Sequence, residues 1–339
     1  MIDTVEKLEE ALSRPLQGEV EAMRALDGDI LILGVGGKMG PSLAKLARRT
    51  AEAGGTRKRI IGVARFSDDR LLRELQAAGV ETIAMDLLEP NALHRLPDIR
   101  NVVFMAAKKF GTSSAEHETW AMNTYLPGRV AERFRESRIV AFSTGNVYPL
   151  QPVEKGGATE NTPVSPVGEY AQSALGRERL FEYASARWGT RVALLRLNYA
   201  VELRYGVLVD IGTAVNERRP VDLHMGLVNV IWQRDANAVC LRSFAYCDSP
   251  PAILNVTGPE TLSVRYIAER FGKKLGMQPM FSGEESDTAL LNNAAKSHQL
   301  FGYPSVTAGE VIDWSAEWIG AKKPLLNKPT HFETRDGKF

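Results

Sequence analysis

Three glycines spaced three residues apart form the part of this sequence best suited to bind a phosphate group. Gly34, Gly37 and Gly40 directly follow a short run of apolar residues. A helical pattern begins after them, at Pro41. In such a turn the first glycine permits a tight bend, the second lets the backbone approach a pyrophosphate, and the third lets the helix pack on the strand. Because a helix N-terminus also offers free N–H groups and a positive dipole end, this layout predicts a dinucleotide-binding site.

Strands and helices alternate along the first two thirds of the chain. The expected strands are 30–33, 59–65, 80–86, 101–107, 138–144 and 191–197. The expected helices are 68–78, 89–95, 115–136 and 169–187. Strands that are rich in β-branched residues and alternate with helices indicate a parallel sheet covered on both faces. The predicted fold class is therefore α/β, with a doubly wound parallel sheet.

The alternation becomes irregular after residue 198. Helices are expected at 207–218, 234–246, 262–276, 287–300 and 308–319, with short strands near 221–223 and 252–256. This pattern predicts a smaller mixed domain over the C-terminal edge of the sheet, where ligands of such sheets bind. We expect an N-terminal helical extension at 1–27, a dinucleotide-binding domain at 28–198 joined by parts of 225–258, a substrate-binding domain at 199–224 and 259–325, and an extended or partly disordered tail at 326–339.

The composition gives no sign of a nucleic-acid or membrane partner. Lys plus Arg number 42 against 41 Asp plus Glu, so no excess of positive charge favours an anionic surface. No apolar run approaches the ~20 residues needed to cross a bilayer, and the N-terminus lacks the pattern of a signal peptide. The two cysteines, Cys240 and Cys247, fit a reducing compartment and have no neighbouring metal ligands. We therefore expect a cytoplasmic protein without a metal site.

Several further landmarks follow the glycine turn in a fixed order. They are Asp86-Leu87 after the third strand, Ala106-Ala107 after the fourth, Asn123 in the long helix, STGNVY at 143–148, Tyr170 at the start of the next helix, and NVTGPETLSV at 255–264. With these landmarks the chain resembles an extended short-chain dehydrogenase/reductase of the NAD-dependent epimerase/dehydratase type. The resemblance implies a Rossmann-type domain that holds NAD(H) or NADP(H), hydride transfer at a carbinol or ketone, and a homodimer formed through the helices at 115–136 and 169–187.

The resemblance also implies which residues contact the cofactor. They are Gly34, Gly37, Lys38, Met39, Gly40, Arg65, Asp86, Leu87, Ala106, Ala107, Asn123 and Tyr170. The tip of the second strand distinguishes the two cofactors, because an acidic residue there binds free ribose hydroxyls and a basic residue suits a 2′-phosphate. Ala64 stands where the acid is expected, and Arg65 follows it. With Ser67 and Lys38 nearby, Arg65 favours NADP, and NAD is the alternative.

In the family a Ser or Thr orients the substrate oxygen, a Tyr exchanges its proton, and a Lys four residues after the Tyr lowers the pKa of the phenol. The resemblance places Thr144 in the first role, with Ser143 before it, and Tyr170 in the second. Ala174 stands where the lysine is expected. A phenol with a pKa of ~10 is a poor base at neutral pH without a nearby cation. The missing lysine is therefore the most informative departure from the family pattern.

Three explanations for Ala174 stay open. Another cation could act on the phenol, and the candidates are Arg177 on the same helix face and the lysines of the 108–112 loop. A lysine of this loop is a better candidate than Arg177, because a guanidinium cannot share a proton. Of the two lysines we prefer Lys109. The protein could also catalyse a reaction in which Tyr170 is not the base. Finally, it could be a catalytically weak or inactive NADP-binding regulatory or interaction protein.

Two more departures bear on the substrate. Gly145 and Asn146 replace the Asp-Glu pair of the family's dehydratases, which argues against a dehydratase. Val228 stands where family members that bind nucleotide sugars often carry a diphosphate-binding Arg. We therefore favour an oxidoreductase or epimerase that acts on a polyhydroxylated small molecule such as a sugar, sugar acid or hydroxy acid, with a nucleotide-sugar epimerase as an alternative. Candidates to line this site are Asn198, Tyr199, Trp232 and Gln233.

Overall fold

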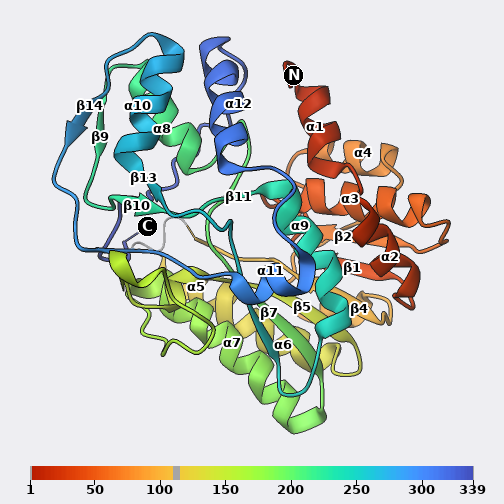
Figure 1. Ribbon diagram of the computed structural model, residues 1–339. Coiled ribbons are helices and arrows are strands. Elements are labelled where there is room, and N and C mark those ends of the chain that lie inside the picture. The colour runs from red at the N-terminus through yellow and green to blue at the C-terminus, as the bar shows by residue number, and fades with distance from the viewer. Residues whose placement is uncertain (1, 110–114, 339) are drawn as a thin grey trace.

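A seven-stranded parallel sheet forms the centre of the computed structural model, which describes residues 2–109 and 115–338 (Figure 1). From one edge to the other its strands are β12 (Ala252–Val256), β7 (Arg191–Leu197), β5 (Arg138–Thr144), β4 (Asn101–Phe104), β1 (Ile30–Leu33), β2 (Ile60–Ala64) and β3 (Glu81–Ala84). All neighbouring pairs are parallel. The predicted Rossmann-type α/β fold is confirmed.

The strand order changes direction between β1 and β4. These two strands pair directly, with Leu33 opposite Phe104. Chain segments that leave β1 and β4 therefore start side by side at the same edge of the sheet. In doubly wound sheets the ligand binds at this point. The glycine turn follows β1, and residues 105–109 follow β4.

Helices cover both faces of the sheet, and the side chains of β1 show the division. Ile30 and Ile32 belong to the core cluster formed with α3 (Gly40–Ala53) and α9 (Gln233–Arg242). The alternate residues of the same strand, Leu31 and Leu33, pack in the cluster on the other face. Since both sets are fully buried, the apolar run of β1 has no solvent-facing side.

The second face is covered by α6 (Leu126–Arg133) and the long helix α7 (Gly168–Trp188). The helix predicted at 115–136 is divided into α5 (Glu116–Trp120), a π-helical turn (Ala121–Tyr125) and α6. On the first face lies α4 (Asp69–Ala77), beside α3. The short helix predicted at 89–95 is only a 3₁₀ turn at Leu93–Arg95.

Two N-terminal helices, α1 (Val5–Ser13) and α2 (Gln17–Ala25), pack against α3 and α9. Ion pairs fix them there. Glu9 accepts from Lys45 of α3 at 2.8 Å, and Glu19 pairs with the buried Arg234 of α9. These helices are thus part of the packed molecule.

The rest of the chain lies above the sheet in Figure 1 and is built around three helices packed on one another. They are α8 (Val207–Asn216), α10 (Val264–Leu275) and α12 (Ala308–Gly320). Four two-stranded sheets complete the described structure: β6 (Gln151–Pro152) with β15 (Thr288–Ala289), β8 (Ala200–Val201) with β11 (Ile231–Trp232), β9 (Pro220–Asp222) with β14 (Met280–Ser282), and β10 (Leu227–Val228) with β13 (Leu262–Ser263). The boundaries of the predicted domains remain a prediction.

The helix predicted at 287–300 is wrong over its first half. Residues 288–289 form β15, and α11 spans only Ala295–Phe301. Three successive residues, 289–291, are all buried, so this run has no helical amphipathic face. The tail after α12 has no helix or strand among residues 321–338, as predicted for an extended segment. No helix in the described parts of the chain has both the length and the apolar character needed to span a bilayer.

Candidate active site

The glycine turn leaves open space at only one of its three regularly spaced glycines. Gly34 has a φ of 93°, and a Cβ there would lie 2.5 Å from the backbone nitrogen of Ala106. A Cβ on Gly40 would lie 2.2 Å from the carbonyl oxygen of Val35. A Cβ on Gly37 would meet only one atom, the carbonyl oxygen of Gly34 at 3.4 Å. Internal packing therefore requires Gly34 and Gly40, whereas Gly37 leaves room for the close approach of a pyrophosphate at the start of α3.

The other candidate cofactor residues lie along the same edge of the sheet. Arg65 is exposed directly after β2. Asp86 follows β3, and its Oδ1 accepts the backbone N–H of Leu88 at 2.9 Å. Ala106 and Ala107, like Leu87, occupy the turns after their strands. This edge can accommodate a dinucleotide that extends from β3 to β4.

Asn123 holds the segment after β4 in place. Its Oδ1 accepts the N–H of Lys108 at 2.8 Å, and its Nδ2 donates to the carbonyl of Lys108 at 2.8 Å and to Ser173 Oγ at 3.0 Å. The side chain is fully buried. Asn123 therefore fixes the residues after β4 against α7, and its contact with a cofactor stays a prediction.

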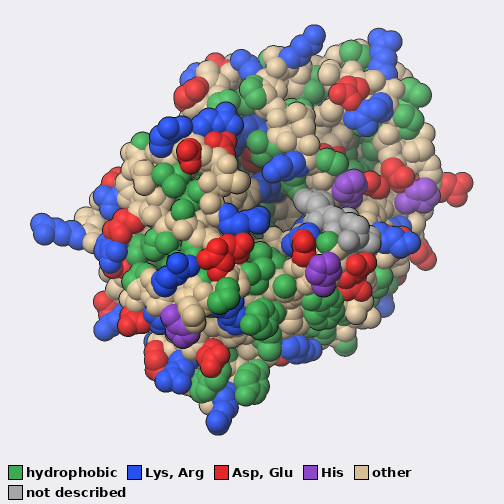
Figure 2. Space-filling model, turned by 180° about the vertical axis from the view of Figure 1, so that it is seen from behind, with side chains coloured by type: hydrophobic (Ala, Val, Ile, Leu, Met, Phe, Trp, Pro, Cys, Tyr) green, Lys and Arg blue, Asp and Glu red, His purple; other side chains and the backbone are tan. Residues whose placement is uncertain are grey.

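All four predicted catalytic residues line one pocket of about 150 Å³, which we call the inner pocket. They are Ser143, Thr144, Tyr170 and Lys109. Lys38 and Met39 of the glycine turn line it too, as do Asn198 and Tyr199. Two residues considered for the lining lie elsewhere: Trp232 packs edge-on against Trp314, and Gln233 donates to Ser42 at 2.9 Å. Seen from behind, the molecule is hollowed near the centre of this face, and Lys and Arg side chains border the hollow (Figure 2).

Thr144 is oriented by its neighbour Asn146. The Oγ1 of Thr144 accepts the backbone N–H of Asn146 at 3.2 Å and its Nδ2 at 3.0 Å. A hydroxyl has two acceptor lone pairs and one hydrogen to donate. Since Asn146 uses the lone pairs, Thr144 is set up to donate its hydrogen to an oxygen in the inner pocket.

Ser143 is tied into a buried ionic network instead. Its Oγ donates to Glu178 Oε1 at 2.5 Å. Glu178 also accepts from Arg196 Nε at 3.0 Å and Nη2 at 2.7 Å, and Arg196 donates to Tyr148 Oη at 2.8 Å. The network joins β5, β7 and α7 and so fixes α7, which carries Tyr170 in its first turn. The catalytic role of Ser143 stays a prediction.

Ala174 lies in a small apolar cluster with Val147, Tyr148 and Ala158 and is fully buried. No charge reaches Tyr170 from this position of α7. Any cation that acts on the phenol must therefore come from another position.

Two partly buried lysines from different loops line the inner pocket with Tyr170 instead. The Nζ of Lys109 lies 5.9 Å from the centre of the Tyr170 ring and donates to the carbonyl of Thr330 at 3.4 Å. The Nζ of Lys38 donates to the carbonyl of Ala200 at 2.8 Å and lies 3.6 Å from the centre of the Tyr205 ring. Burial lowers the pKa of Lys109 to about 8. Burial also lowers the pKa of Lys38. The negative charge of Glu202 raises this pKa, and the positive charge of Lys109 lowers it further.

The sequence predicts Lys38 near a ribose phosphate. It does not predict that Lys38 also lines the pocket of Thr144 and Tyr170. Its ammonium enters the inner pocket, where Thr144 and Tyr170 lie. A lysine two residues before the last glycine of such a turn was the only signal available in the sequence. Of the other candidates, Lys108 pairs with Glu118 and is not part of the inner pocket. Residues 110–112 of the 108–112 loop lie outside the described residues.

Arg177 is buried on α7, about two helical turns after Tyr170. Its Nη1 donates to the carbonyl of Phe142 at 2.6 Å. Its Nη2 is buried and has no hydrogen-bond partner among the described residues. Burial lowers the pKa of Arg177, and the nearby Tyr170 opposes this effect.

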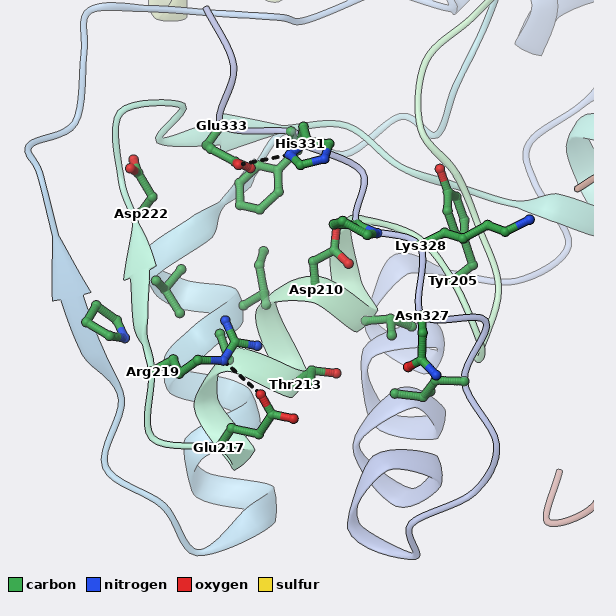
Figure 3. Close-up of a pocket in the computed structure, with 18 of the residues that line it drawn as sticks. Tyr205, Asp210, Thr213, Glu217, Arg219, Asp222, Asn327, Lys328, His331 and Glu333 are labelled. Atoms are coloured by element: carbon green, nitrogen blue, oxygen red, sulfur yellow. Dashed lines mark hydrogen bonds and ion pairs between the residues drawn. The ribbon is translucent and has the colours of Figure 1, made fainter. Parts of the chain in front are cut away.

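A larger cavity of about 580 Å³, which we call the outer cavity, lies next to the inner pocket (Figure 3). Its walls come from α8, β9 and the C-terminal tail, and Tyr205 lines both spaces. Both signs of charge line it: Asp210, Glu217, Asp222 and Glu333 against Arg204, Arg219, Lys328 and His331. In the described parts of the chain, no cluster of His, Cys, Asp and Glu could hold a metal ion.

Comparison with protein-family models assigns residues 30–201 to the description "NAD dependent epimerase/dehydratase family". The chain belongs to this family. The match runs from β1 to β8 and so contains the glycine turn, Lys109, Thr144 and Tyr170. It confirms the resemblance that the sequence landmarks indicated. A comparison with curated proteins gave no match.

Solved structures of epimerases and dehydratases have the same fold. A UDP-glucuronic acid 4-epimerase from Bacillus cereus, bound to UDP-glucuronic acid and NAD, superposes with a TM-score of 0.70 at 17% identity and covers 86% of this chain and 98% of its own. MoeE5, bound to UDP-glucose and NAD, gives 0.70 at 20% identity over 86% and 98%. DesIV, a dTDP-glucose 4,6-dehydratase from Streptomyces venezuelae with NAD and TYD bound, gives 0.71 at 16% identity over 86% and 96%. At these identities the likeness establishes the fold.

Gly34 and Gly37 have different surroundings, so replacing each of them by alanine tests the cofactor site. We expect Gly37→Ala to leave the free energy of unfolding within about 0.5 kcal/mol and to weaken the binding of NAD⁺ or NADP⁺ at least tenfold. Gly34→Ala should instead destabilise the protein, by about 1–3 kcal/mol, because its Cβ would overlap Ala106. Urea unfolding and titration of intrinsic fluorescence with cofactor measure both effects. Unchanged cofactor affinity in Gly37→Ala would contradict this account of the turn.

Lys109 should make stability depend on pH in a defined direction. Because burial lowers its pKa in the folded state to about 8, its charged form is disfavoured by folding. We expect Lys109→Met to raise the free energy of unfolding at pH 7 by on the order of 1–3 kcal/mol. The gain should shrink as the pH rises from about 8 toward the ~10.4 of an unfolded lysine, where the ammonium is lost in both states.

Urea unfolding at pH 7 and pH 10 measures this difference. Lys108→Met is the matched control, since Lys108 is partly exposed and paired with Glu118. A gain of equal size at both pH values would show that burial of the charge is not its cause.

Proposed function

We propose that the protein is an NAD(P)-dependent oxidoreductase or epimerase that acts at a carbinol or ketone of a compact polyhydroxylated molecule, such as a sugar or sugar acid. One observation carries this proposal: Thr144, Tyr170 and the partly buried lysines Lys38 and Lys109 line a single pocket beside the glycine turn. Membership of an NAD-dependent epimerase/dehydratase family supports it. Bound at the turn, a nicotinamide cofactor would supply the hydride acceptor or donor.

Thr144 and Tyr170 have complementary roles at the substrate oxygen. Thr144 donates its hydrogen to this oxygen, because Asn146 occupies the lone pairs of the hydroxyl. The phenolate of Tyr170 accepts the proton that the substrate hydroxyl loses as it becomes a carbonyl, and returns it in the reverse direction. Together they hold the reacting oxygen and move one proton.

The two lysines replace the charge that Ala174 cannot supply. A positive charge near Tyr170 stabilises its phenolate form. Burial brings the pKa of Lys109 to about 8, so that its ammonium can also give up and regain a proton near neutral pH. Arg177 carries a guanidinium, which does not share a proton near neutral pH, so it contributes only its field.

NADP is the cofactor that we propose, with NAD as the alternative. Arg65 is exposed at the end of β2, and Ala64 before it offers no carboxylate to the ribose hydroxyls. Asp86 uses Oδ1 to cap its own turn and keeps Oδ2 for an adenine amino group. The solved structures with this fold were determined with NAD, and at 16–20% identity they do not decide between the cofactors.

A nucleotide-sugar epimerase is the second candidate, and the outer cavity favours it. A cavity of about 580 Å³ has room for a nucleotide beside the inner pocket. Against it, Val228 is fully buried in β10, so the expected diphosphate-binding Arg is missing and its position faces the core. Arg219, which does line the cavity, already pairs with Glu217 at 2.8 Å (Figure 3). We therefore rank this function second.

We also propose that the protein forms a homodimer. Trp120 and Tyr125 near α6 and Tyr183 on α7 are exposed large side chains, with exposed fractions of 38, 61 and 58%. Exposed aromatic residues on neighbouring helices are typical of protein interfaces. Light scattering on the purified protein determines the number of subunits.

A substrate screen tests the proposed function. Free sugars, sugar acids, hydroxy acids and nucleotide sugars are incubated with protein and NADP⁺ or NAD⁺, and the absorbance of the reduced nicotinamide is followed. Chromatography of the products is needed as well, because an epimerase returns its hydride. We expect turnover of a free sugar or sugar acid, and a loss of about 10²–10⁴-fold in kcat in Tyr170→Phe, measured at saturating cofactor. Turnover of nucleotide sugars alone, or full activity of Tyr170→Phe, would contradict the proposal.

Arg65 provides the test of cofactor choice. We expect Arg65→Ala to weaken NADP⁺ binding about 10–100-fold, since one charge-assisted hydrogen bond to a phosphate contributes about 1.5–3 kcal/mol. The affinity for NAD⁺ should change less than about twofold. Arg70→Ala is the matched control, because Arg70 is exposed nearby and pairs with Asp68. An equal loss for both cofactors would refute the selective role of Arg65.

A further inference from the structure

We propose that the C-terminal tail, residues 325–338, is a specificity-determining wall that separates the outer cavity from the inner pocket and restricts the reaction to compact substrates. The inference rests on the proposed function of the inner pocket. It assigns the tail a role in selecting substrates by size, so that a molecule with a large substituent on the reacting sugar is excluded. Four observations support it.

The tail passes between the two cavities. Thr330 is buried, with an exposed fraction of 2%, and lines the inner pocket. The residues on both sides of it, 327–329 and 331–333, line the outer cavity instead (Figure 3). Tyr205 lines both spaces. One turn of the tail therefore forms the partition, and its removal would join the cavities into one cleft.

Hydrogen bonds to α8 fix the tail at the partition itself. The N–H and the Oγ1 of Thr330 both donate to Oδ2 of Asp210, at 2.8 and 2.5 Å. Two residues later, Phe332 is buried, and its carbonyl accepts from Tyr199 Oη at 3.5 Å. Two hydrogen bonds to the Asp210 carboxylate thus fix Thr330 at the partition.

The end of the tail is anchored beside the catalytic helix. Arg335 donates from Nη1 to the carbonyl of Thr288 at 2.8 Å and from Nη2 to its Oγ1 at 2.5 Å. Gly337 packs so closely on Gly168 that a Cβ on Gly168 would lie 2.3 Å from the carbonyl oxygen of Gly337. Since Gly168 begins α7, the wall ends two residues before Tyr170.

The wall also covers a lysine that the reaction uses. The carbonyl of Thr330 accepts from Lys109 Nζ at 3.4 Å. The carboxylate of Asp210, which holds Thr330, raises the pKa of Lys109 and so opposes the lowering by burial. With the wall in place the space beside Lys109 and Tyr170 is about 150 Å³, which suits a small molecule and cannot take a nucleotide.

Chemical labelling of Lys109 tests the wall independently of turnover. The protein is treated with acetic anhydride, a small acylating reagent, and with a biotin N-hydroxysuccinimide ester, a bulky one, and mass spectrometry locates the labelled lysines. We compare the full chain with a chain that ends at Asn327. A full-length double variant, Asp210→Ala with Arg335→Ala, releases two anchors and serves if the shortened chain does not fold. Lys338→Ala, an exposed residue near the end of the tail, is the matched control.

We expect the bulky ester to label Lys109 at least tenfold faster in the shortened chain or the double variant than in the full chain and the Lys338→Ala control. The small reagent should discriminate less between the forms. Equal rates with the bulky ester in all forms would overturn the inference.

If the substrate screen finds no turnover, the proposed function fails, whereas the labelling rates still show whether the wall covers Lys109. If it finds a substrate, the shortened chain should also act on derivatives that carry a larger substituent, and an unchanged size limit would contradict the wall.

Discussion

The close approach of Gly34 to Ala106 is the contact on which the rest of this site depends. A Cβ on Gly34 would lie 2.5 Å from the backbone nitrogen of Ala106, so only glycine lets the turn after β1 pass this near to the turn after β4. The approach occurs where the strand order changes direction, and the edge of the sheet opens there. A phosphate-binding turn and a catalytic loop thus begin from one point.

The same contact brings two lysines near Tyr170 although residue 174 is an alanine. Lys38 follows Gly34 by four residues, and Lys109 follows Ala106 by three. Because the two turns touch, both ammonium groups enter the pocket that holds Thr144 and Tyr170. Burial lowers the pKa of each lysine. Ala174, by contrast, fills an apolar cluster and helps α7 to pack. The positive charge near Tyr170 therefore comes from the two lysines and not from residue 174.

Much of the fold follows from local patterns in the sequence. The strands 138–144 and 191–197 have the predicted bounds, because buried parallel strands leave continuous apolar runs between clear turn signals. The segment 287–300 misled the prediction, since its apolar residues face a core from a short strand and an irregular loop. Two features of the pocket, the entry of the Lys38 ammonium and the presence of Thr330, depend on contacts between residues more than 150 positions apart in sequence, with Ala200 and Lys109 respectively as partners. For these contacts a single sequence carries no local signal.

The central claim is that cations from outside the expected position act on Tyr170 and the cofactor. A crystal structure of the protein with bound NADP⁺ tests it most directly. The account predicts that Nζ of Lys38 or Lys109 lies within hydrogen-bond distance of Tyr170 Oη, and that one of these lysines contacts the nicotinamide ribose. A structure in which no Lys or Arg nitrogen reaches either group would contradict the claim and would favour an NADP-binding protein without this catalysis.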